Sequence, residues 1–376
     1  MTPTALLEYF DGRRDDMIAA IRELVDIGSP SHDAAASRQV ARWVEDKFIG
    51  TGAPIAVERV PCEDGEHVVV RAFAGEGQPT VLIGHTDTVH PLGTEIKNPT
   101  RIEDDRFYGC GIFDMKANVV LMFEALRYFA SSRKRPLSPV KIVLSCDEEV
   151  GSFTGREIIE REVADAARCM IFEPSANGSV KTGRKGTGMF TVKAHGVPAH
   201  AGLEPEKGAN AVTELARQVE RINAITRPEL GTTVNVTTFH GGTTNNVIPD
   251  LATCEVDVRF SNAAEAGRVA RELNDLESTD PRVSLQLIGD INRPPMERTE
   301  QVASLYQHAR ELAASFGYEL GEAQVGGGSD GNFVAAMGIP VLDGLGITGD
   351  GAHTLHEHIL VSDIAKRATL VTLLLS

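Results

Sequence analysis

The spacing of hydrophobic residues divides the chain into two kinds of segment. Stretches with apolar residues every three or four positions, typical of helices that bury one face, alternate with short apolar runs such as TVLIG from Thr80 and VKIVLSC from Val140. Such continuous runs are typical of strands that are buried on both faces in a parallel sheet. The alternation predicts an α/β domain with a largely parallel central sheet flanked by helices. The expected helices are 5–27, 34–48, 117–129 and 155–163, with further strands from Val68 and Cys169.

The pattern changes in the middle of the chain and then returns. Between about Gly186 and Ile291 it predicts the order β-α-β-β-α-β, which is that of a ferredoxin-like unit. We therefore expect an inserted α+β lid or dimerisation domain at 184–292, within a catalytic domain formed by 1–183 and 293–376. The inserted strands are expected at 189–194, 232–239, 253–260 and 283–287, its helices at 210–224 and 263–276, and the catalytic domain resumes with a helix at 300–316, a strand from Ile339 and a helix from Ser362.

Composition restricts the class of partner. The chain has 376 residues and a net charge of −16 without a long basic run, which argues against nucleic acid and anionic membrane surfaces as partners. Its five scattered cysteines lack a CxxC pair, so neither a disulfide framework nor a thiolate zinc site is indicated. The N-terminal segment has no signal-peptide pattern, and no apolar stretch reaches the ~18 residues of a membrane span. We expect a cytoplasmic protein that binds small molecules or metals.

Residues that can bind metals follow several of the predicted strands. In an open α/β sheet, ligands gather beyond the carboxyl ends of the strands, so these residues are expected at one edge. Each one alone is more often a capped or solvated residue, but together they indicate a metal site. Oxygen and imidazole donors without thiolate suit a hydrolytic zinc, cobalt or manganese site. The residues are His85, Asp87, Asp114, Glu148, Glu149, Glu173 and His353.

The adjacent glutamates in SCDEEVGS fit this interpretation, because one of them can bind metal while its neighbour acts as general base. The ordered motifs GHTDTV, GCGIFDMK, DEEVGS, EPS, HGVPAHAG, NNVIP, GGGSDGN and GAHTLHE, spread over nearly the whole chain, resemble those of the M20 metallopeptidases. The triple glycine of GGGSD most resembles the glutamate carboxypeptidase (carboxypeptidase G2-like) branch. Relatives of that branch include acetylornithine deacetylase, succinyl-diaminopimelate desuccinylase and aminoacylases.

The resemblance implies specific roles in a site with two Zn²⁺ ions per chain, where Co²⁺ or Mn²⁺ are alternatives. His85 and Glu173 would bind one ion, Glu149 and His353 the other, and Asp114 would bridge them. Glu148 would be the general base and acid, and Asp87 would bond the ring of His85 and fix its tautomer. Glu357, four residues after His353, fits the ending of the family motif and is expected to be structural.

The resemblance also implies substrate contacts outside the metal ligands. His200 would reach the active site of a partner subunit and stabilise the oxyanion, although a surface histidine is an equal alternative from sequence alone. Asn246 would bind substrate, although Asn is common in turns. Arg259 would bind a terminal carboxylate of the substrate. Gly328 and Ser329 of GGGSD are assigned to substrate binding; a phosphate loop is disfavoured because GxxxxGK[ST] is absent.

These observations together predict a homodimeric dizinc hydrolase that cleaves an amide or peptide bond next to a free carboxylate. The first expected substrate is an N-acyl-glutamate or a dipeptide-like compound that releases C-terminal glutamate. The alternative is an N-acyl-amino-acid deacylase, such as acetylornithine deacetylase, succinyl-diaminopimelate desuccinylase or aminoacylase. A non-enzymatic metal-binding or peptide-binding module is disfavoured, because the expected base and all the expected ligands are present.

Overall fold

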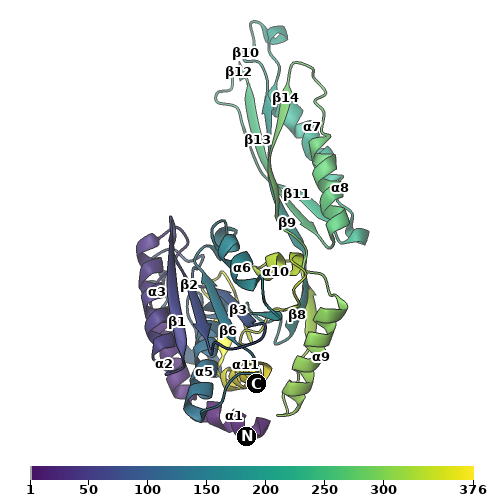
Figure 1. Cartoon of the computed structure of the whole chain (residues 1–376). Helices are drawn as coiled ribbons and strands as arrows, with labels where there is room; N and C mark the ends of the chain where they lie inside the picture. The colour runs from purple at the N-terminus through teal and green to yellow at the C-terminus, as the bar shows by residue number, and fades with distance from the viewer. Residues whose placement is uncertain (1) are drawn as a thin grey trace. The chain divides into compact units, whose positions relative to one another are not determined.

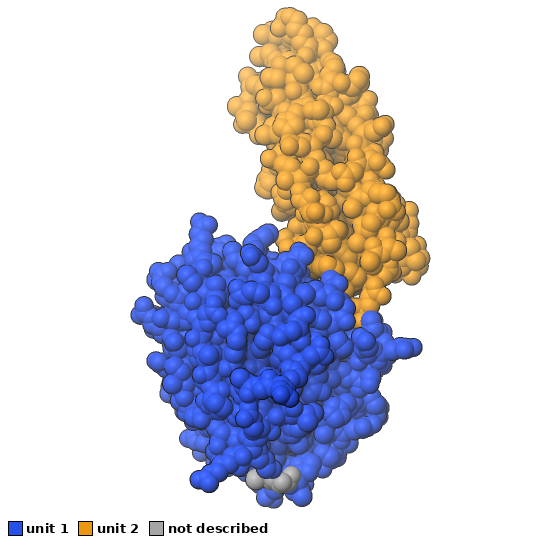
Figure 2. Space-filling view, viewed as in Figure 1, with its two compact units in different colours: residues 1–183, 298–324, 329–376 blue, residues 184–297, 325–328 orange. Residues whose placement is uncertain are grey.

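The structure is a computed structural model that describes residues 2–376. The chain folds into two compact units (Figure 2). Unit 1 is Met1–Gly183, Arg298–Gln324 and Ser329–Ser376, and unit 2 is Arg184–Glu297 and Val325–Gly328. The catalytic domain was expected to resume at Arg293, whereas unit 1 resumes at Arg298. The reason is that Arg184 and Met296 exchange backbone hydrogen bonds of 2.9 and 3.0 Å, which keep this return segment within unit 2.

The core of unit 1 is a six-stranded sheet in the order β1-β2-β6-β3-β7-β16 (Figure 1). Neighbours β6, β3, β7 and β16 are parallel, while β1 and β2 form an antiparallel edge. All six residues of β3 are buried, as expected for a strand that is covered on both faces. The strands are β1 (Ile55–Cys62), β2 (Gly65–Ala72), β3 (Thr80–His85), β6 (Val140–Ser145), β7 (Arg168–Ile171) and β16 (Val341–Leu342).

The winding of this sheet reverses direction at β3. The chain passes from β3 through α5 (Ala117–Ser132) to β6, and then through α6 (Gly155–Val163) to β7 on the other side of β3. Because such crossovers are right-handed, the two helices cover opposite faces, and β3 is the switch point at whose carboxyl end ligands bind in folds of this kind. Beyond the N-terminal segment, unit 1 also contains α3 (Ala34–Ile49), α4 (Thr94–Lys97), α9 (Glu300–Ala314), α10 (Gly331–Ala336) and α11 (Val361–Leu375).

The N-terminal segment differs from the single helix expected at 5–27. It forms α1 (Pro3–Gly12) and α2 (Arg14–Val25), separated at Arg13, whose φ and ψ are −102° and 3°. The Arg13 guanidinium bonds the buried Glu124 of α5 at 2.7 Å, and this tertiary contact accompanies the break in the helical pattern. No helix of residues 2–376 has the length and apolar character needed to cross a bilayer.

Smaller strands complete unit 1 and carry loops of the candidate site. One small sheet has the order β17-β18-β5-β4 and another pairs β15 with β8. Their members are β4 (Arg101–Glu103), β5 (Arg106–Tyr108), β8 (Val180–Arg184), β15 (Glu322–Val325), β17 (Gly349–Asp350) and β18 (His358–Leu360).

Unit 2 has the β-α-β-β-α-β order that the sequence predicts. Its antiparallel sheet has the order β11-β13-β9-β14, and buried residues of the sheet and its two helices form a separate apolar core. A two-stranded pair, β10 (Ala199–His200) with β12 (Val247–Ile248), lies at one end of the unit (Figure 1). The other elements are β9 (Gly186–His195), α7 (Ala211–Asn223), β11 (Thr233–Gly241), β13 (Leu251–Phe260), α8 (Ala263–Asn274) and β14 (Ser284–Arg293).

Candidate metal centre

Three neighbouring strands deliver acidic or imidazole side chains to one edge of the unit 1 sheet. His85 is the last residue of β3 and pairs with Ser145, the last residue of β6. Glu148 and Glu149 follow β6 in a short 3-10 turn, and Glu173 comes two residues after the end of β7, the other neighbour of β3. Strand register therefore brings these loops side by side, as the sequence predicts for the carboxyl ends of parallel strands.

Asp114 and His353 reach the same edge through a different pair of strands. Tyr108 at the end of β5 pairs with His358 at the start of β18, so the loop before Asp114 runs beside the loop after His353. Gly111 in the first loop has φ 68°, and a Cβ there would lie 2.3 Å from Cγ2 of Thr88, so only glycine fits. The peptide bond between Asp114 and Met115 is cis.

Glu357 joins these two loops. Its Oε1 accepts hydrogen bonds from the amides of Phe113 and Asp114, both at 2.9 Å, and its Oε2 accepts from the amide of Gly111 at 2.8 Å. His90 Nε2 lies 2.9 Å from the same Oε2, and Glu357 is buried. The expected structural role therefore takes a specific form, since Glu357 fixes the backbone that presents Asp114. The sequence analysis did not identify His90, and no spacing signal marks it.

The first ligand group is His85, Asp114 and Glu173, whose ligand atoms all lie within 4.8 Å of one another. Nδ1 of His85 is 3.0 Å from the backbone carbonyl oxygen of Asp87, which can only accept, so Nδ1 carries a proton. Nε2 then points its lone pair toward Oδ1 of Asp114 at 3.0 Å and Oε1 of Glu173 at 3.7 Å. In the neutral ring three acceptors face one another, an arrangement that requires a shared proton or a cation.

The second ligand group is Asp114, Glu149 and His353. Nε2 of His353 is 3.3 Å from Oδ2 of Asp114 and 3.2 Å from Oε2 of Glu149. Asp114 thus directs one oxygen to each group. Oε1 of Glu149 is buried and has no hydrogen-bond partner, which is rare for a carboxylate oxygen unless an ion binds it. The donor set and this orphaned oxygen fit a pair of divalent cations bridged by Asp114.

The electrostatics of the two groups point the same way. Hydrogen bonds to Asp114 and Glu149 raise the pKa of His353 to about 10. Burial alone would lower the pKa of His85, but its bonds to Asp114 and Asp87 raise it well above the usual value. Burial raises the pKa of Glu149. The lone pairs of these groups therefore bind protons strongly, and a cation that binds the same lone pairs must displace the protons.

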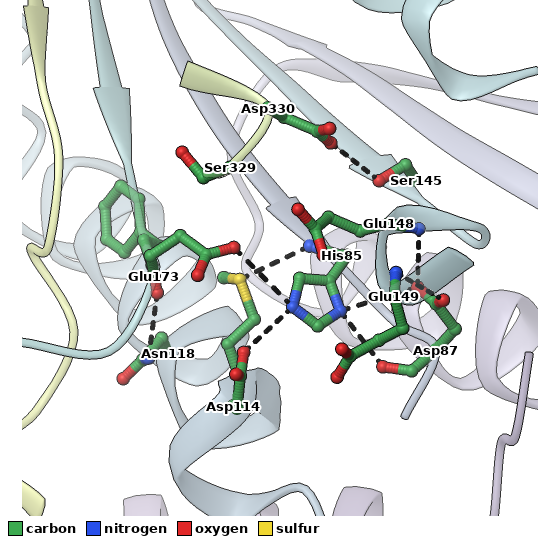
Figure 3. A network of polar contacts seen from close by, with 12 residues as sticks. His85, Asp87, Asp114, Asn118, Ser145, Glu148, Glu149, Glu173, Ser329 and Asp330 are labelled. Atoms are coloured by element: carbon green, nitrogen blue, oxygen red, sulfur yellow. Dashed lines mark hydrogen bonds and ion pairs between the residues drawn. The ribbon is translucent and has the colours of Figure 1, made fainter. Parts of the chain in front are cut away.

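Asp87 has a wider role than the one expected from sequence. Its carboxylate accepts hydrogen bonds from the amides of Glu148 and Glu149, at 3.2 and 3.1 Å, and from the hydroxyl of Ser31 at 2.7 Å. The ring of His85 lies nearer to the backbone oxygen of Asp87, at 3.0 Å, than to its carboxylate, at 3.4 Å. Asp87 therefore orients both the ligand His85 and the adjacent glutamates. Figure 3 shows Asp114 and Glu173 on one side of His85 and the two glutamates on the other.

The GGGSD loop is arranged differently from the substrate-binding role expected for it. Ser329 is fully buried, and its hydroxyl donates to Oδ2 of Asp343 at 2.6 Å, so this side chain does not support the expected substrate contact. Asp330 accepts from Ser145 at 3.1 Å and from Ser152. Gly328 belongs to unit 2, where its carbonyl accepts from Arg184 at 3.0 Å. The side chains of Ser329 and Asp330 thus fix the loop to neighbouring segments of unit 1.

The remaining predicted residues occupy two ends of unit 2. His200 pairs with Val247, and the amide of Ala201 donates to the carbonyl of Asn246 at 2.9 Å, so His200 and Asn246 share one end. Both side chains are exposed. Arg259 is near the far end of β13, opposite Thr187, and its guanidinium forms a bidentate pair with Asp257 at 3.0 and 2.7 Å.

Comparison with known proteins agrees with this architecture. The model of peptidase family M20/M25/M40 matches residues 81–376. The chain is 28% identical over 358 residues to carboxypeptidase G2 of Pseudomonas sp. (strain RS-16), covering 93% of this chain and 86% of that protein. It is 30% identical over 256 residues to succinyl-diaminopimelate desuccinylase of Corynebacterium glutamicum, covering 65% and 66%. A dinuclear metal binding M20 peptidase of Bacillus subtilis shares the fold, with a TM-score of 0.65, 14% identity and coverage of 97% and 99%.

Proposed function

We propose that this chain, which belongs to peptidase family M20/M25/M40 and is a metallohydrolase of amide or peptide bonds, releases an amino acid with a free carboxylate. Glutamate is the amino acid that we expect it to release. The observation that carries the proposal is the pair of ligand groups that share Asp114, with Glu148 beside them. Full-length similarity to carboxypeptidase G2 supports glutamate as the first product to test. Similarity to a desuccinylase supports N-acyl-amino-acid deacylation as the second candidate.

We assign the metal ligands as the resemblance of the sequence motifs implies. His85 and Glu173 would hold one Zn²⁺, Glu149 and His353 would hold the other, and Asp114 would offer one oxygen to each; Co²⁺ and Mn²⁺ suit the same donors. When bound, such a pair of ions polarises the scissile carbonyl and lowers the pKa of the attacking water. Zinc is the metal to test first, because imidazole and carboxylate donors without thiolate are typical of catalytic zinc.

Glu148 moves the proton in this proposal. It takes a proton from the attacking water and delivers it to the nitrogen of the leaving amine, the two tasks of one general base and acid. Asp87 holds the backbone of Glu148 and of the ligand Glu149 at 3.2 and 3.1 Å, so base and ligand keep a fixed spacing. His200 donates a hydrogen bond to the oxyanion that forms from the carbonyl.

We propose that His200 and Asn246 serve the active site of a second copy of this chain. Within unit 2 they lie beyond the Leu251 end of β13, while Arg259 is near its other end. Eight residues of strand separate Leu251 from Arg259, about 26 Å at ~3.3 Å per residue. An extended dipeptide spans only about 7 Å, so one small substrate cannot contact both ends of this unit.

The surface around His200 supports a homodimer formed through unit 2. Leu203 is 76% exposed, Leu251 46% and Val247 36%, and all three lie at the same end of the unit as His200. Apolar side chains gathered beside a functional histidine are typical of a surface that another protein covers. In the proposed dimer, Arg259 binds the α-carboxylate of the substrate, for which it must exchange its present partner Asp257. The cysteines are free thiols, as expected in a reducing compartment, and we include the cytoplasm in the proposal.

A substrate panel tests the proposal. The zinc-loaded protein is incubated with N-acyl-glutamates, dipeptides ending in glutamate, N-acetylornithine and N-succinyl-diaminopimelate, and the released amino acid is identified by mass spectrometry. Each acid is paired with its α-amide. We expect two metal ions per chain, release of glutamate, and a strong preference for acid over amide. A protein that holds two metals but cleaves acids and amides equally would contradict the carboxylate requirement, and preferential cleavage of the acylated diamino acids would establish the deacylase alternative.

A further inference from the structure

Two cysteines meet next to the turn that carries Glu148 and Glu149, in a position that the proposed reaction does not use. Sγ of Cys62, the last residue of β1, lies 3.5 Å from Sγ of Cys146. Cys146 comes directly after β6, two residues before Glu148, and is 1% exposed, whereas Cys62 is half-buried. Both thiols are free.

A glycine in the hairpin after Cys62 allows that hairpin to pack closely. Gly65 pairs with Cys62 in the β1-β2 hairpin and has φ 148°. A Cβ on Gly65 would lie 2.0 Å from Oγ of Ser37 and 3.7 Å from Sγ of Cys146. The glycine is therefore required by the close approach of Ser37, which packs the hairpin of Cys62 against the segment that carries Cys146 at ordinary contact distance.

His67 lies close enough to make a three-ligand group with the two thiols, but its ring is already engaged. Nδ1 of His67 accepts from the amide of Cys146 at 3.2 Å, so the proton of the neutral ring is on Nε2, which donates to Oγ1 of Thr154 at 2.9 Å. Thr154 in turn donates to Asp147 at 2.8 Å. A metal ion would need the Nε2 lone pair and would break this chain of bonds, whereas a bond between the sulfur atoms leaves it intact.

We propose that Cys62 and Cys146 form a thiol modification site that hydrogen peroxide converts to a disulfide. In the first step the sulfur of Cys62 attacks one peroxide oxygen and the O–O bond breaks, giving Cys62–SOH and water. In the second step the sulfur of Cys146 displaces that hydroxyl, giving the Cys62–Cys146 bond and a second water. Two thiol hydrogens and one peroxide are consumed, and the two sulfur atoms are oxidised together by two electrons.

The surroundings assign the order of these steps. Burial raises the pKa of the Cys146 thiol, so at neutral pH it stays protonated and shielded from solvent. Cys62 is the more accessible of the two and therefore meets the oxidant first. Cys146, in contact with Cys62, then acts as the resolving thiol.

The disulfide is expected to lower turnover because both cysteines connect to reacting residues. The sulfur atoms must approach from 3.5 Å to about 2.05 Å, so the two cysteines are drawn toward each other when the bond forms. Cys146 adjoins the turn that carries Glu148. Cys62 adjoins the hairpin turn where Asp64 lies 2.8 Å from Nδ1 of His32, next to Ser31, which bonds Asp87. A displacement near 1 Å in such a site costs up to about 100-fold in rate, so we expect kcat to fall by about 10- to 100-fold.

Peptide mass mapping tests the chemistry without reference to activity. The metal-loaded full chain is treated with hydrogen peroxide, quenched with catalase, alkylated and digested. We expect a linked peptide pair containing Cys62 and Cys146, and a decrease from the five thiols of the chain to three. Cys62→Ser should form no such pair and should keep its basal activity, while Cys254→Ser, a control at a buried site in unit 2, should behave as wild type.

Two further readouts complete the test. Turnover of the oxidised wild type, on whichever substrate the panel identifies, should fall and then return after a phosphine reductant is added, whereas Cys62→Ser should keep its activity in peroxide. Linkage without loss of turnover would overturn the regulatory part of the proposal, and absence of linkage would overturn all of it. Loss of one bound zinc per chain in Cys62→Ser would instead assign the cysteines and His67 to a metal site and overturn the disulfide.

Discussion

The residues that we assign to one reaction lie in both units. The fold brings those of unit 1 together, but it leaves those of unit 2 apart. In unit 1, five ligands from five loops converge, and Asp114 already directs one oxygen to each imidazole. In unit 2, His200 and Asn246 are exposed at one end and Arg259 is paired with Asp257 near the other. The candidate metal ligands therefore come together within one compact unit, whereas the proposed substrate contacts of unit 2 have to be completed by the substrate and a second chain.

We expect the largest effect from a substitution that removes the proposed general base of unit 1 and leaves its metal ligands in place. Glu148→Gln should lower kcat by about 10²- to 10⁴-fold, because the amide cannot accept and return a proton, while the five ligands are unchanged. Metal analysis and steady-state kinetics check this. Glu157→Gln, an exposed residue on α6, is the matched control and should be silent. Residual kcat above about a tenth of wild type would remove Glu148 from the role of base.

The second prediction tests whether unit 2 acts on another copy of the chain. His200→Ala should lower kcat by about 10²- to 10³-fold, the usual effect of losing an oxyanion donor. The exposed His240 on β11 provides a control, since His240→Ala should keep full activity.

Mixing then separates action in a partner from action within one chain. When His200→Ala chains exchange with Glu148→Gln chains, about half of the dimers are mixed, and each has one site with an intact Glu148 and a partner's intact His200. Activity should therefore recover to about a quarter of wild type. Subunit exchange seen by native mass spectrometry without any recovery would refute the shared site.

The third prediction concerns the positioning of Asp114 by Glu357. Glu357→Gln replaces one acceptor oxygen with an NH₂ group, which faces backbone N–H donors at 2.8 or 2.9 Å. Loss of such supporting bonds typically costs 10- to 100-fold in metal affinity or activity. We expect that weakening in a titration against a metal buffer, with partial rescue of kcat by excess metal. His356→Ala, an exposed neighbour, is the control, and unchanged metal affinity in Glu357→Gln would contradict the role.

The same contrast explains how much the sequence predicts. Strand ends and their order locate His85, Glu149 and Glu173, because parallel register is local and periodic. The hydrogen bond from Ser329 to Asp343 and the ion pair of Arg259 with Asp257 could not be predicted from the sequence. Each depends on side-chain conformations, which leave no periodic pattern in the sequence. The break at Arg13 has the same origin, since a tertiary ion pair with Glu124 accompanies the end of a helical pattern.

The fourth prediction asks whether Arg259 recognises the substrate carboxylate. Arg259→Ala should lower kcat/KM by about tenfold for acids and leave the matched amides within about twofold, because a charge-assisted hydrogen bond is lost only with the acid. Asp257→Asn sharpens the comparison, since it frees the guanidinium from a competing carboxylate and should lower KM for acids. Equal losses on acid and amide in Arg259→Ala would make this arginine structural.

The smallest effect concerns the stability of unit 2 alone. Burial would raise the pKa of Glu214, but hydrogen bonds from Thr279, at 2.5 Å from the hydroxyl and 2.9 Å from the amide, and from Gln218 lower it to about 2. A lowered folded-state pKa gives stability that is present above the unfolded value near 4.5 and is lost as the pH falls toward 2. Glu214→Gln should therefore cost about 1–3 kcal/mol at pH 7 and show a weaker loss of stability below pH 5 than wild type.

The single tryptophan makes this last effect separable from unit 1. Trp43 lies on α3, so its fluorescence reports unfolding of unit 1, while far-UV circular dichroism reports both units. In Glu214→Gln at pH 7, we expect the dichroism transition to begin a few degrees lower, with the fluorescence transition unchanged. Glu220→Gln, exposed on the same helix, should match wild type. If both signals shift together in Glu214→Gln, the two units unfold as one, and the independence on which the comparison rests is wrong.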